Sequence, residues 1–256
     1  MISHSPDFDL LLKAQARPEG TPLMRQSWHN LLFAHARIEP SVIERRLPEG
    51  LTLQTFDGDA WIGFVPFQMK NVRFTDWRSF WPQPNFLETN LRTYVTHPEH
   101  GPGVWFFSLD ANAFLPCLFA RKMFSLPYCY AGLDFVDNDY YGTRADRQRF
   151  PKVWESPSKN LRYTAKIQPN GVPQLAAPES FEFWLLERYR LYSADRSGQL
   201  MTSRVWHEPY QVAEPYVAEF KVESDDPRLA NLSFEHFRFC AGVEVQAFAP
   251  TSIARP

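Results

Sequence analysis

The sequence predicts a domain of the α+β class that is mostly β. Aromatic residues are abundant, with 22 Phe, 10 Tyr and 8 Trp, and they favour strands and wide packing layers. The 22 prolines outnumber the 11 glycines, which favours rigid turns between strands. The clearest local signal is a hairpin, in which Asp57-Gly58 joins two segments with strand character.

The domain organisation follows from length and composition. The chain has 256 residues, of which 44% are hydrophobic, enough for one large core or two small ones. No internal repeat or linker divides it. We therefore expect an N-terminal arm or short surface helix over residues 1–22 and a single domain over residues 23–250.

The first elements precede and include the hairpin. Residues 27–38 are apolar enough for a strand or a helix. Residues 40–47 fit a short amphipathic helix with apolar residues on its inner face, and Pro48-Glu-Gly50 ends it. In the hairpin, residues 51–56 and 60–69 are the two expected strands.

A Trp- and Pro-rich loop at 77–84 then precedes a strand pair at 86–95 and 104–109. Residues 112–124 predict the central helix, with Asn112 as its cap and with basic residues in its last turn. Apolar residues on one face predict a second helix over 178–192. The remaining strands are predicted at 129–136, 149–156, 160–167, 200–207, 216–222 and 236–248.

Charge and cysteine usage narrow the class of protein. The net charge of −2 and the scattered basic residues do not fit a general nucleic-acid-binding protein. Three scattered cysteines do not form a disulfide framework, and free buried thiols fit a reducing compartment. The N-terminus lacks the pattern of a signal peptide, and no apolar run is long enough for a membrane helix. We expect a soluble cytoplasmic protein without a nucleic-acid or membrane partner; a homo-oligomer stays open.

Motifs for the common cofactors and metals are missing from the sequence. It contains no phosphate-binding glycine loop, no His-Glu-x-x-His, no Gly-x-Ser-x-Gly and no cysteine pair with zinc spacing. His97 and His100 are three residues apart in a segment rich in Pro and Gly, which indicates a turn. We therefore expect no cofactor and no metal site.

Several segments together resemble the YqjF-like bacterial family of the acetoacetate decarboxylase-like superfamily. They are Trp28-His-Asn-Leu-Leu-Phe-Ala-His35, Leu47-Pro-Glu-Gly-Leu51, Thr55-Phe-Asp-Gly-Asp-Ala-Trp61, Val65-Pro-Phe67, Phe86-Leu-Glu-Thr-Asn-Leu-Arg-Thr-Tyr-Val95, Gly103-Val-Trp-Phe-Phe-Ser-Leu-Asp110, Ala120-Arg121, Leu126-Pro-Tyr128 and Glu187-Arg-Tyr189. The resemblance implies a cone-shaped, partly open β-barrel with external helices and an internal cavity.

The resemblance also locates the chemistry of that superfamily. The decarboxylase uses a lysine that follows a proline, has its pKa lowered by an adjacent lysine and forms a Schiff base with its substrate. Here Pro127 is followed by Tyr128 and Cys129. A phenol cannot form an iminium, so the resemblance implies a site but not this mechanism. It also implies that Glu88 is the cavity glutamate and that Arg37, or His35 two residues earlier, takes the place of the cavity arginine.

The candidate site residues each have a structural alternative. Glu88, Asn90, Arg92 and Tyr94 alternate along one predicted strand and so share a face, as a site or as an internal salt bridge. Tyr128 is a proton donor, a carboxylate ligand or a ring of the wall. The further candidates are His35 as a base or a core residue, Cys129, which needs a nearby base to react, and Arg121 and Arg37 as substrate ligands.

Three hypotheses follow for the function. In the first, the protein binds or converts a small carboxylate or polar metabolite in its cavity without a Schiff-base lysine. The second is a non-catalytic binding or structural module with a vestigial cavity. The third is a decarboxylase or aldolase-type enzyme that uses a displaced lysine, Lys122.

Overall fold

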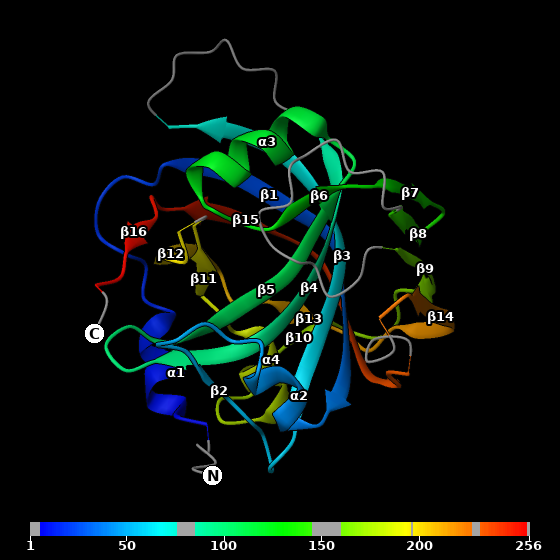
Figure 1. Ribbon diagram of the computed structural model, residues 1–256. Coiled ribbons are helices and arrows are strands. Elements are labelled where there is room, and N and C mark those ends of the chain that lie inside the picture. Colours follow the sequence, from blue (N-terminus) through cyan, green and yellow to red (C-terminus); the bar gives the residue numbers. More distant parts are fainter. Residues whose placement is uncertain (1–5, 76–84, 145–159, 196, 227–230, 255–256) are drawn as a thin grey trace.

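The computed structural model describes residues 6–75, 85–144, 160–195, 197–226 and 231–254. Helices lie at both ends of a sheet that is wrapped around itself (Figure 1). None of the helices in these ranges has the length and apolar character needed to cross a bilayer. Their bounds are α1 (Phe8–Ala14), α2 (Pro40–Glu44), α3 (Phe114–Met123) and α4 (Phe181–Leu186).

The strands of the main sheet form a closed ring. It runs in the order β4-β3-β1-β15-β12-β11-β5, and β5 pairs again with β4. β2 and β6 extend the sheet at β4 and β5, and β16 pairs with β12. The bounds are β1 (Met24–Ile38), β2 (Thr52–Leu53), β3 (Ala60–Phe74), β4 (Phe86–His97), β5 (Gly101–Ala111), β6 (Tyr128–Tyr130), β11 (Arg190–Ala194), β12 (Leu200–His207), β15 (Phe234–Ala247) and β16 (Thr251–Ser252).

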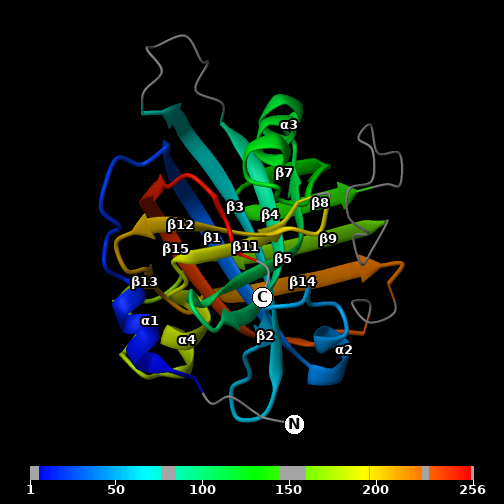
Figure 2. The ribbon, with the colours of Figure 1, turned by 60° about the vertical axis from the view of Figure 1, so that its left-hand side comes forward.

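A second sheet covers part of the outside of this ring. It has the order β14-β9-β8-β7, and a two-stranded sheet, β10-β13, lies separately (Figure 2). Phe64 of β3 packs edge-on against Tyr163 of β9, with ring centroids 4.9 Å apart. The bounds are β7 (Gly132–Val136), β8 (Asp139–Arg144), β9 (Leu161–Gln168), β10 (Gln174–Leu175), β13 (Gln211–Val212) and β14 (Tyr216–Ser224).

The second sheet gives the ring strands two buried faces. Along β1, Leu31 and Phe33 belong to the core inside the ring, whereas Leu32 and Ala34 belong to the core between the two sheets. A strand that is buried on both faces loses its polar alternation. This is why the apolar content of residues 27–38 is equally compatible with a strand and a helix.

Ring closure is weakest on one side. β11 joins β5 in parallel through the pairs Leu191–Val104 and Tyr192–Trp105, and β12 joins β15 through a similarly short stretch. The mostly-β prediction and the barrel are thus confirmed. The strand pair β4–β5 and the strands β9, β12, β14 and β15 also lie close to their predicted positions.

The predicted hairpin is only partly correct. Asp57 and Gly58 have positive φ angles, and Phe56 and Asp59 exchange two backbone hydrogen bonds across them, so the turn forms. The strand before it, β2, however pairs with β4 instead of β3. The turn therefore reverses the chain without fixing which strands pair.

Two helix predictions are also corrected. The helix predicted over 178–192 ends at Leu186, because the following segment extends to Arg190 and enters the ring as β11. Asn112 does not cap α3: its side chain accepts a hydrogen bond from the backbone of Leu87 and donates one to the carbonyl of Leu133. The predictions for residues 77–84 and 149–156 fall outside the described residues.

The N-terminal arm contains α1 and contacts the domain closely. Leu11 is buried in the inner core. Arg204 donates hydrogen bonds to the carbonyls of Ala14 and Ala16, and the Trp206 indole donates one to the carbonyl of Gln15. The arm thus covers one side of the ring near β12.

A substitution of Gly103 tests how tightly β5 and β11 pack where they close the ring. A Cβ atom at Gly103 would lie 2.7 Å from the Tyr192 ring and 2.8 Å from the carbonyl oxygen of Arg190, where β5 meets β11. We expect Gly103→Ala to lower the free energy of unfolding by about 1–3 kcal/mol, as overpacking does. Urea denaturation measures the change. Gly132→Ala is the matched control, because the nearest atom to its Cβ would be at 3.8 Å; equal effects of both variants would contradict the tight contact.

Candidate functional site

The interior of the ring contains a cavity of about 110 Å³. Its wall is mainly apolar and aromatic, with residues such as Phe33, Phe67 and Phe106 contributed by several strands. A few polar side chains reach into it, the composition typical of ligand pockets. They are Gln26, Glu88, Asn90, Arg92, Tyr128, Arg188 and Tyr210.

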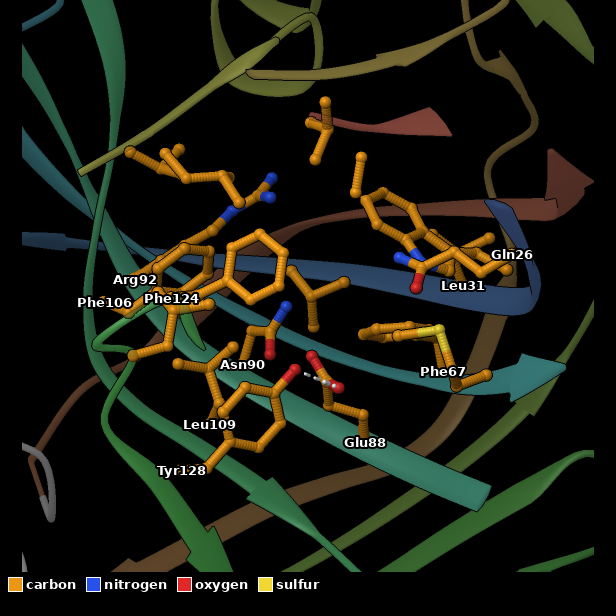
Figure 3. Close-up of a pocket in the computed structure, with 18 of the residues that line it drawn as sticks. Gln26, Leu31, Phe67, Glu88, Asn90, Arg92, Phe106, Leu109, Phe124 and Tyr128 are labelled. Carbon is orange, nitrogen blue, oxygen red and sulfur yellow. Dashed lines mark hydrogen bonds between the residues drawn. The ribbon is translucent and has the colours of Figure 1, made fainter. Parts of the chain in front are cut away.

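β4 supplies the polar side of the wall. Glu88, Asn90 and Arg92 alternate along it and all face the cavity (Figure 3). The residues between them face outward: Thr89 hydrogen-bonds the Tyr163 hydroxyl at 2.6 Å. The alternation therefore predicts the shared face of these three residues correctly.

Glu88 and Tyr128 form a buried hydrogen-bonded pair. The Tyr128 hydroxyl donates to Oε2 of Glu88 at 2.8 Å, and both residues are less than a tenth exposed. Burial raises the pKa of Glu88 to about 8, although hydrogen bonds from Tyr128 and Asn90 act in the opposite direction. Glu88 is therefore a neutral carboxylic acid at pH 7.

Tyr128 is held in place by the end of the β5–α3–β6 connection. It begins β6 and pairs in parallel with Leu109 of β5. Arg121, in the last turn of α3, donates a hydrogen bond to the Tyr128 carbonyl at 3.1 Å. Burial, together with the charge and hydrogen bond of Glu88, raises the pKa of Tyr128 well above its usual value, so its hydroxyl keeps its proton and donates.

Arg92 lies four residues further along β4 than Glu88. The Tyr94 hydroxyl lies beside the Arg92 guanidinium, but the buried Nε and Nη2 atoms make no well-aligned hydrogen bond to a described residue. The guanidinium lies 5.7 Å from the Phe33 ring and 5.9 Å from the Tyr94 ring. The predicted salt bridge with Glu88 does not form, because Asn90 separates the two side chains on the wall (Figure 3).

Arg188 is a site residue that the sequence reasoning missed. It is 4% exposed, lines the cavity and lies 4.8 Å from the Tyr94 ring. The guanidinium donates to the carbonyl of Trp184 and to Oε1 of Gln54, and its buried Nη2 has no partner among the described residues. The Glu187-Arg188-Tyr189 motif drew attention to this position, but the helix predicted over 178–192 did not indicate that Arg188 faces the cavity.

Three other candidates lie near the cavity without lining it. Tyr94 is fully buried and packs between the Trp184 ring and the two arginines. Cys129 directs its thiol toward the carbonyl of Pro127, and Arg121 contacts the backbone of Tyr128. These residues support the wall, so their placement does not favour direct contact with a ligand.

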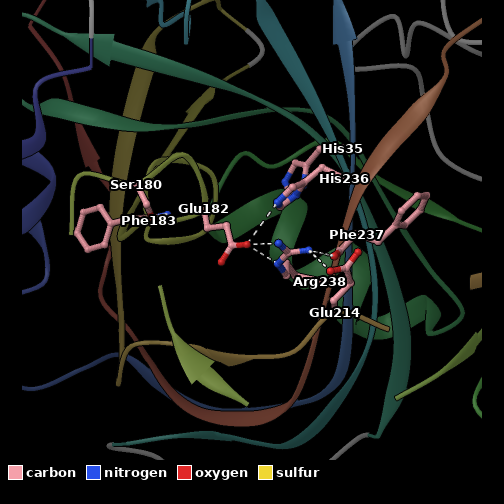
Figure 4. Close-up of polar contacts among 8 residues, drawn as sticks. All are labelled: His35, Ser180, Glu182, Phe183, Glu214, His236, Phe237 and Arg238. Atoms are coloured by element: carbon pink, nitrogen blue, oxygen red, sulfur yellow. Dashed lines mark hydrogen bonds and ion pairs between the residues drawn. The ribbon is translucent and has the colours of Figure 1, made fainter. Parts of the chain in front are cut away.

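His35 lies behind the wall. It is fully buried and does not line the cavity, and its Nδ1 is 3.4 Å from Nδ1 of His236, which faces Glu182 of α4 (Figure 4). Burial, followed by the charges of His236 and Arg92, holds the pKa of His35 well below its usual value. The structure thus favours a neutral core histidine over a general base in the cavity.

Arg37 and Lys122 lie on the surface. The Arg37 side chain is 59% exposed and forms ion pairs with Asp59 and Glu235 at the end of β1, where the strand extends past the cavity. Its expected position in the cavity is therefore wrong, and Arg92 and Arg188 are the arginines among the described lining residues. Lys122 is exposed on α3, and none of the described residues that line the cavity is a lysine.

Comparison with known sequences gives one family. The model of DUF2071, described as an uncharacterized conserved protein, matches residues 25–244. The uncharacterized protein YqjF of Bacillus subtilis (strain 168) is 36% identical over 197 residues, which are 75% of this chain and 76% of that protein. This agrees with the family resemblance of the sequence motifs.

Comparison with solved structures gives the fold. The enduracididine biosynthesis enzyme MppR, complexed with pyruvate, aligns with a TM-score of 0.59 and 13% identity over 94% of this chain and 93% of that one. Acetoacetate decarboxylase from Legionella pneumophila aligns with a TM-score of 0.59 and 11% identity, over 93% and 92% of the two chains. At such low identity these similarities establish an acetoacetate decarboxylase-like fold alone.

The raised pKa of Glu88 predicts a pH dependence of stability. The unfolded chain releases this proton near pH 4.5 and the native state near pH 8, so the native state binds more protons between these values. The free energy of unfolding then falls as pH rises from 4.5 to 8, with a slope from this group of up to about 1.4 kcal/mol per pH unit. We expect Glu88→Gln to lose this component in urea denaturation at pH 5, 6, 7 and 8.

The exposed Glu44 supplies the matched control, since Glu44→Gln removes a carboxyl group outside the cavity. It should keep the slope of the wild type. Parallel stability curves for the wild type and Glu88→Gln would mean that Glu88 is already ionised in the native state.

Proposed function

The chain belongs to the DUF2071 family and has an acetoacetate decarboxylase-like fold, and from this premise we propose that it binds a small organic carboxylate in its cavity without a Schiff-base lysine. Arg92 holds the carboxylate. Glu88, oriented by Tyr128, is the group that donates or accepts a proton. Any reaction in the cavity is then a general acid–base reaction.

The state of Arg92 is the observation that carries this proposal. A buried guanidinium with two donor nitrogens that lack partners among the described residues is costly, because the group has lost its hydration without replacement. A carboxylate accepts two parallel hydrogen bonds from a guanidinium, and this geometry matches the planar fork of arginine. A ligand carboxylate would therefore satisfy the donors that the protein leaves open.

Glu88 supplies the opposite end of the cavity. Four residues of extended strand separate its Cα from that of Arg92, about 13 Å. With Oε2 accepting from Tyr128, the neutral carboxyl group keeps its own proton for the ligand. A pKa near 8 lies close to neutral pH, where a group exchanges protons most effectively. Between the two ends, the Asn90 Oδ1 lacks a partner among the described residues and can accept a hydrogen bond.

The size of the cavity supports a short ligand. Benzene fills a dry protein cavity of about 150 Å³, so the 110 Å³ here suits a short-chain acid. Among proteins of this fold, MppR has been solved with pyruvate, a small 2-oxo acid. That complex concerns MppR, and it supports a ligand of similar size in this chain.

A thermal-shift screen with short carboxylic and 2-oxo acids tests the proposal. A ligand at 100 times its Kd raises the free energy of unfolding by about 2.7 kcal/mol, which is a clear shift in Tm. We expect Arg92→Met to abolish the shift, since it removes the donors that hold the carboxylate. Arg37→Met, an arginine outside the cavity, should keep it. A wild type that binds no acid in the screen would favour the alternative of a vestigial cavity.

Borohydride trapping tests the absence of a Schiff base. No described lining residue is a lysine and Lys122 is exposed, so incubation with pyruvate or acetoacetate and borohydride should leave the protein mass unchanged. Mass spectrometry of the intact chain measures this. A stoichiometric adduct on any lysine would contradict the proposal and restore the iminium mechanism.

A further inference from the structure

We infer that the cavity is built for a small organic dianion, whose two negative charges are shared by Arg92 and Arg188. This inference rests on the proposed function and specifies the charge of its ligand. The chemical classes that fit are short dicarboxylates and small phosphate monoesters. A monocarboxylate would neutralise only one of the two arginines.

The charges of the described lining residues support a dianion. Arg92 and Arg188 are the only cations among them, and Glu88 is the only acid. Since the pKa of Glu88 is about 8, this acid is neutral at pH 7 and cancels neither arginine. The described lining residues therefore carry a net charge of +2, and the burial of both arginines weakens its screening by water.

The two guanidinium groups are close enough to act on one ligand. Both lie against the Tyr94 ring, with Cζ of Arg188 at 4.8 Å and Cζ of Arg92 at 5.9 Å from its centroid. Burial lowers the pKa of Arg188 to about 9, and the charge of Arg92 acts in the same direction against the opposing effect of Tyr94. Two like charges that face the same cavity repel, and an anion between them reverses the sign of the interaction.

The protein does not supply that anion from its described residues. Neither arginine forms an ion pair with a described carboxylate. Glu187, the chain neighbour of Arg188, accepts hydrogen bonds from the Tyr189 hydroxyl and from the backbone of Tyr210 instead. Buried arginines normally form ion pairs. Two buried arginines without an ion pair to a described carboxylate therefore indicate that a ligand supplies the negative charge.

Both arginines also keep donors for a ligand. Two buried donor nitrogens of Arg92, Nε and Nη2, and one of Arg188, Nη2, have no partner among the described residues. The other donors of Arg188 are fixed by Trp184 and Gln54, so its side chain is already oriented before a ligand enters. An arginine that is held in this way loses little conformational entropy when it binds.

Isothermal titration calorimetry at pH 7 with three probes tests the inference. Butyrate and succinate have the same four-carbon chain and differ by one charge, and ethyl phosphate is a dianion of a different class, since its second pKa is near 6. Because a hydrogen bond to a charged group is worth a factor of about 10 to 100, at least one dianion should bind that much more tightly than butyrate. The dianion that binds with the higher affinity identifies the chemical class of the ligand.

Arg188→Met and Arg37→Met form the variant pair. Arg188→Met should lower the affinity for the dianion by about 10- to 100-fold and bring the ratio to butyrate close to one. Arg37→Met removes an exposed arginine and should keep the ratio. If Arg188→Met does not fold, the three probes on the wild type still decide.

The outcomes separate this inference from the function on which it rests. Butyrate binding as tightly as both dianions would overturn the dianion inference and leave the carboxylate site intact. Binding of none of the probes or of the screened acids would overturn both. A preference for a dianion that persists in a folded Arg188→Met variant would remove Arg188 from the site.

Discussion

The other features of the structure depend on the closure of seven strands into a ring. This closure turns one face of each ring strand toward the interior, and the outer sheet buries part of the other face. Polar groups on the inner face must then find partners inside the protein or in a ligand. Glu88 accepts a hydrogen bond from Tyr128, whereas Arg92 and Arg188 keep buried donors that no described residue satisfies. This contrast supports the proposal that a ligand binds at the arginines.

Burial inside the ring also determines how a tyrosine at position 128 affects Glu88. The resemblance to the decarboxylase superfamily places a lysine there, and an ammonium group beside Glu88 would lower the pKa of that acid. A phenol has no charge, so burial dominates and Glu88 stays protonated at neutral pH. If a lysine stood at this position, as the resemblance implies for the decarboxylases, Glu88 would be a carboxylate; the phenol of Tyr128 leaves it a carboxylic acid. A cavity with a neutral acid and two arginines selects for negative charge more strongly than one in which the acid is ionised.

Local patterns in the sequence predict much of this arrangement. The alternation of Glu88, Asn90 and Arg92 is a local property, whereas Tyr128 is indicated by the family resemblance, and both lead to the cavity. The pairing of β2 with β4 and the extended path after Leu186 depend on contacts with distant strands, which periodicity does not contain. Arg37 illustrates the same limit: it shares a strand with cavity residues such as Phe33, but it lies beyond the point where the ring encloses the cavity.

Arg188 shows what a local pattern leaves out. Within Glu187-Arg188-Tyr189, the acid and the base are adjacent and would be expected to neutralise each other. The chain leaves the helix at Leu186, and Glu187 then faces Tyr189 and Tyr210 while Arg188 turns toward the cavity. Separation of this pair leaves the charge of Arg188, in addition to that of Arg92, without an ion pair to a described carboxylate, which lowers the stability of the protein when no anion is bound. A feature of this kind is retained where binding needs it, and natural proteins depart from good packing mainly at functional sites. The unfavourable charge of the cavity and the proposed affinity for an anion are thus two consequences of one arrangement.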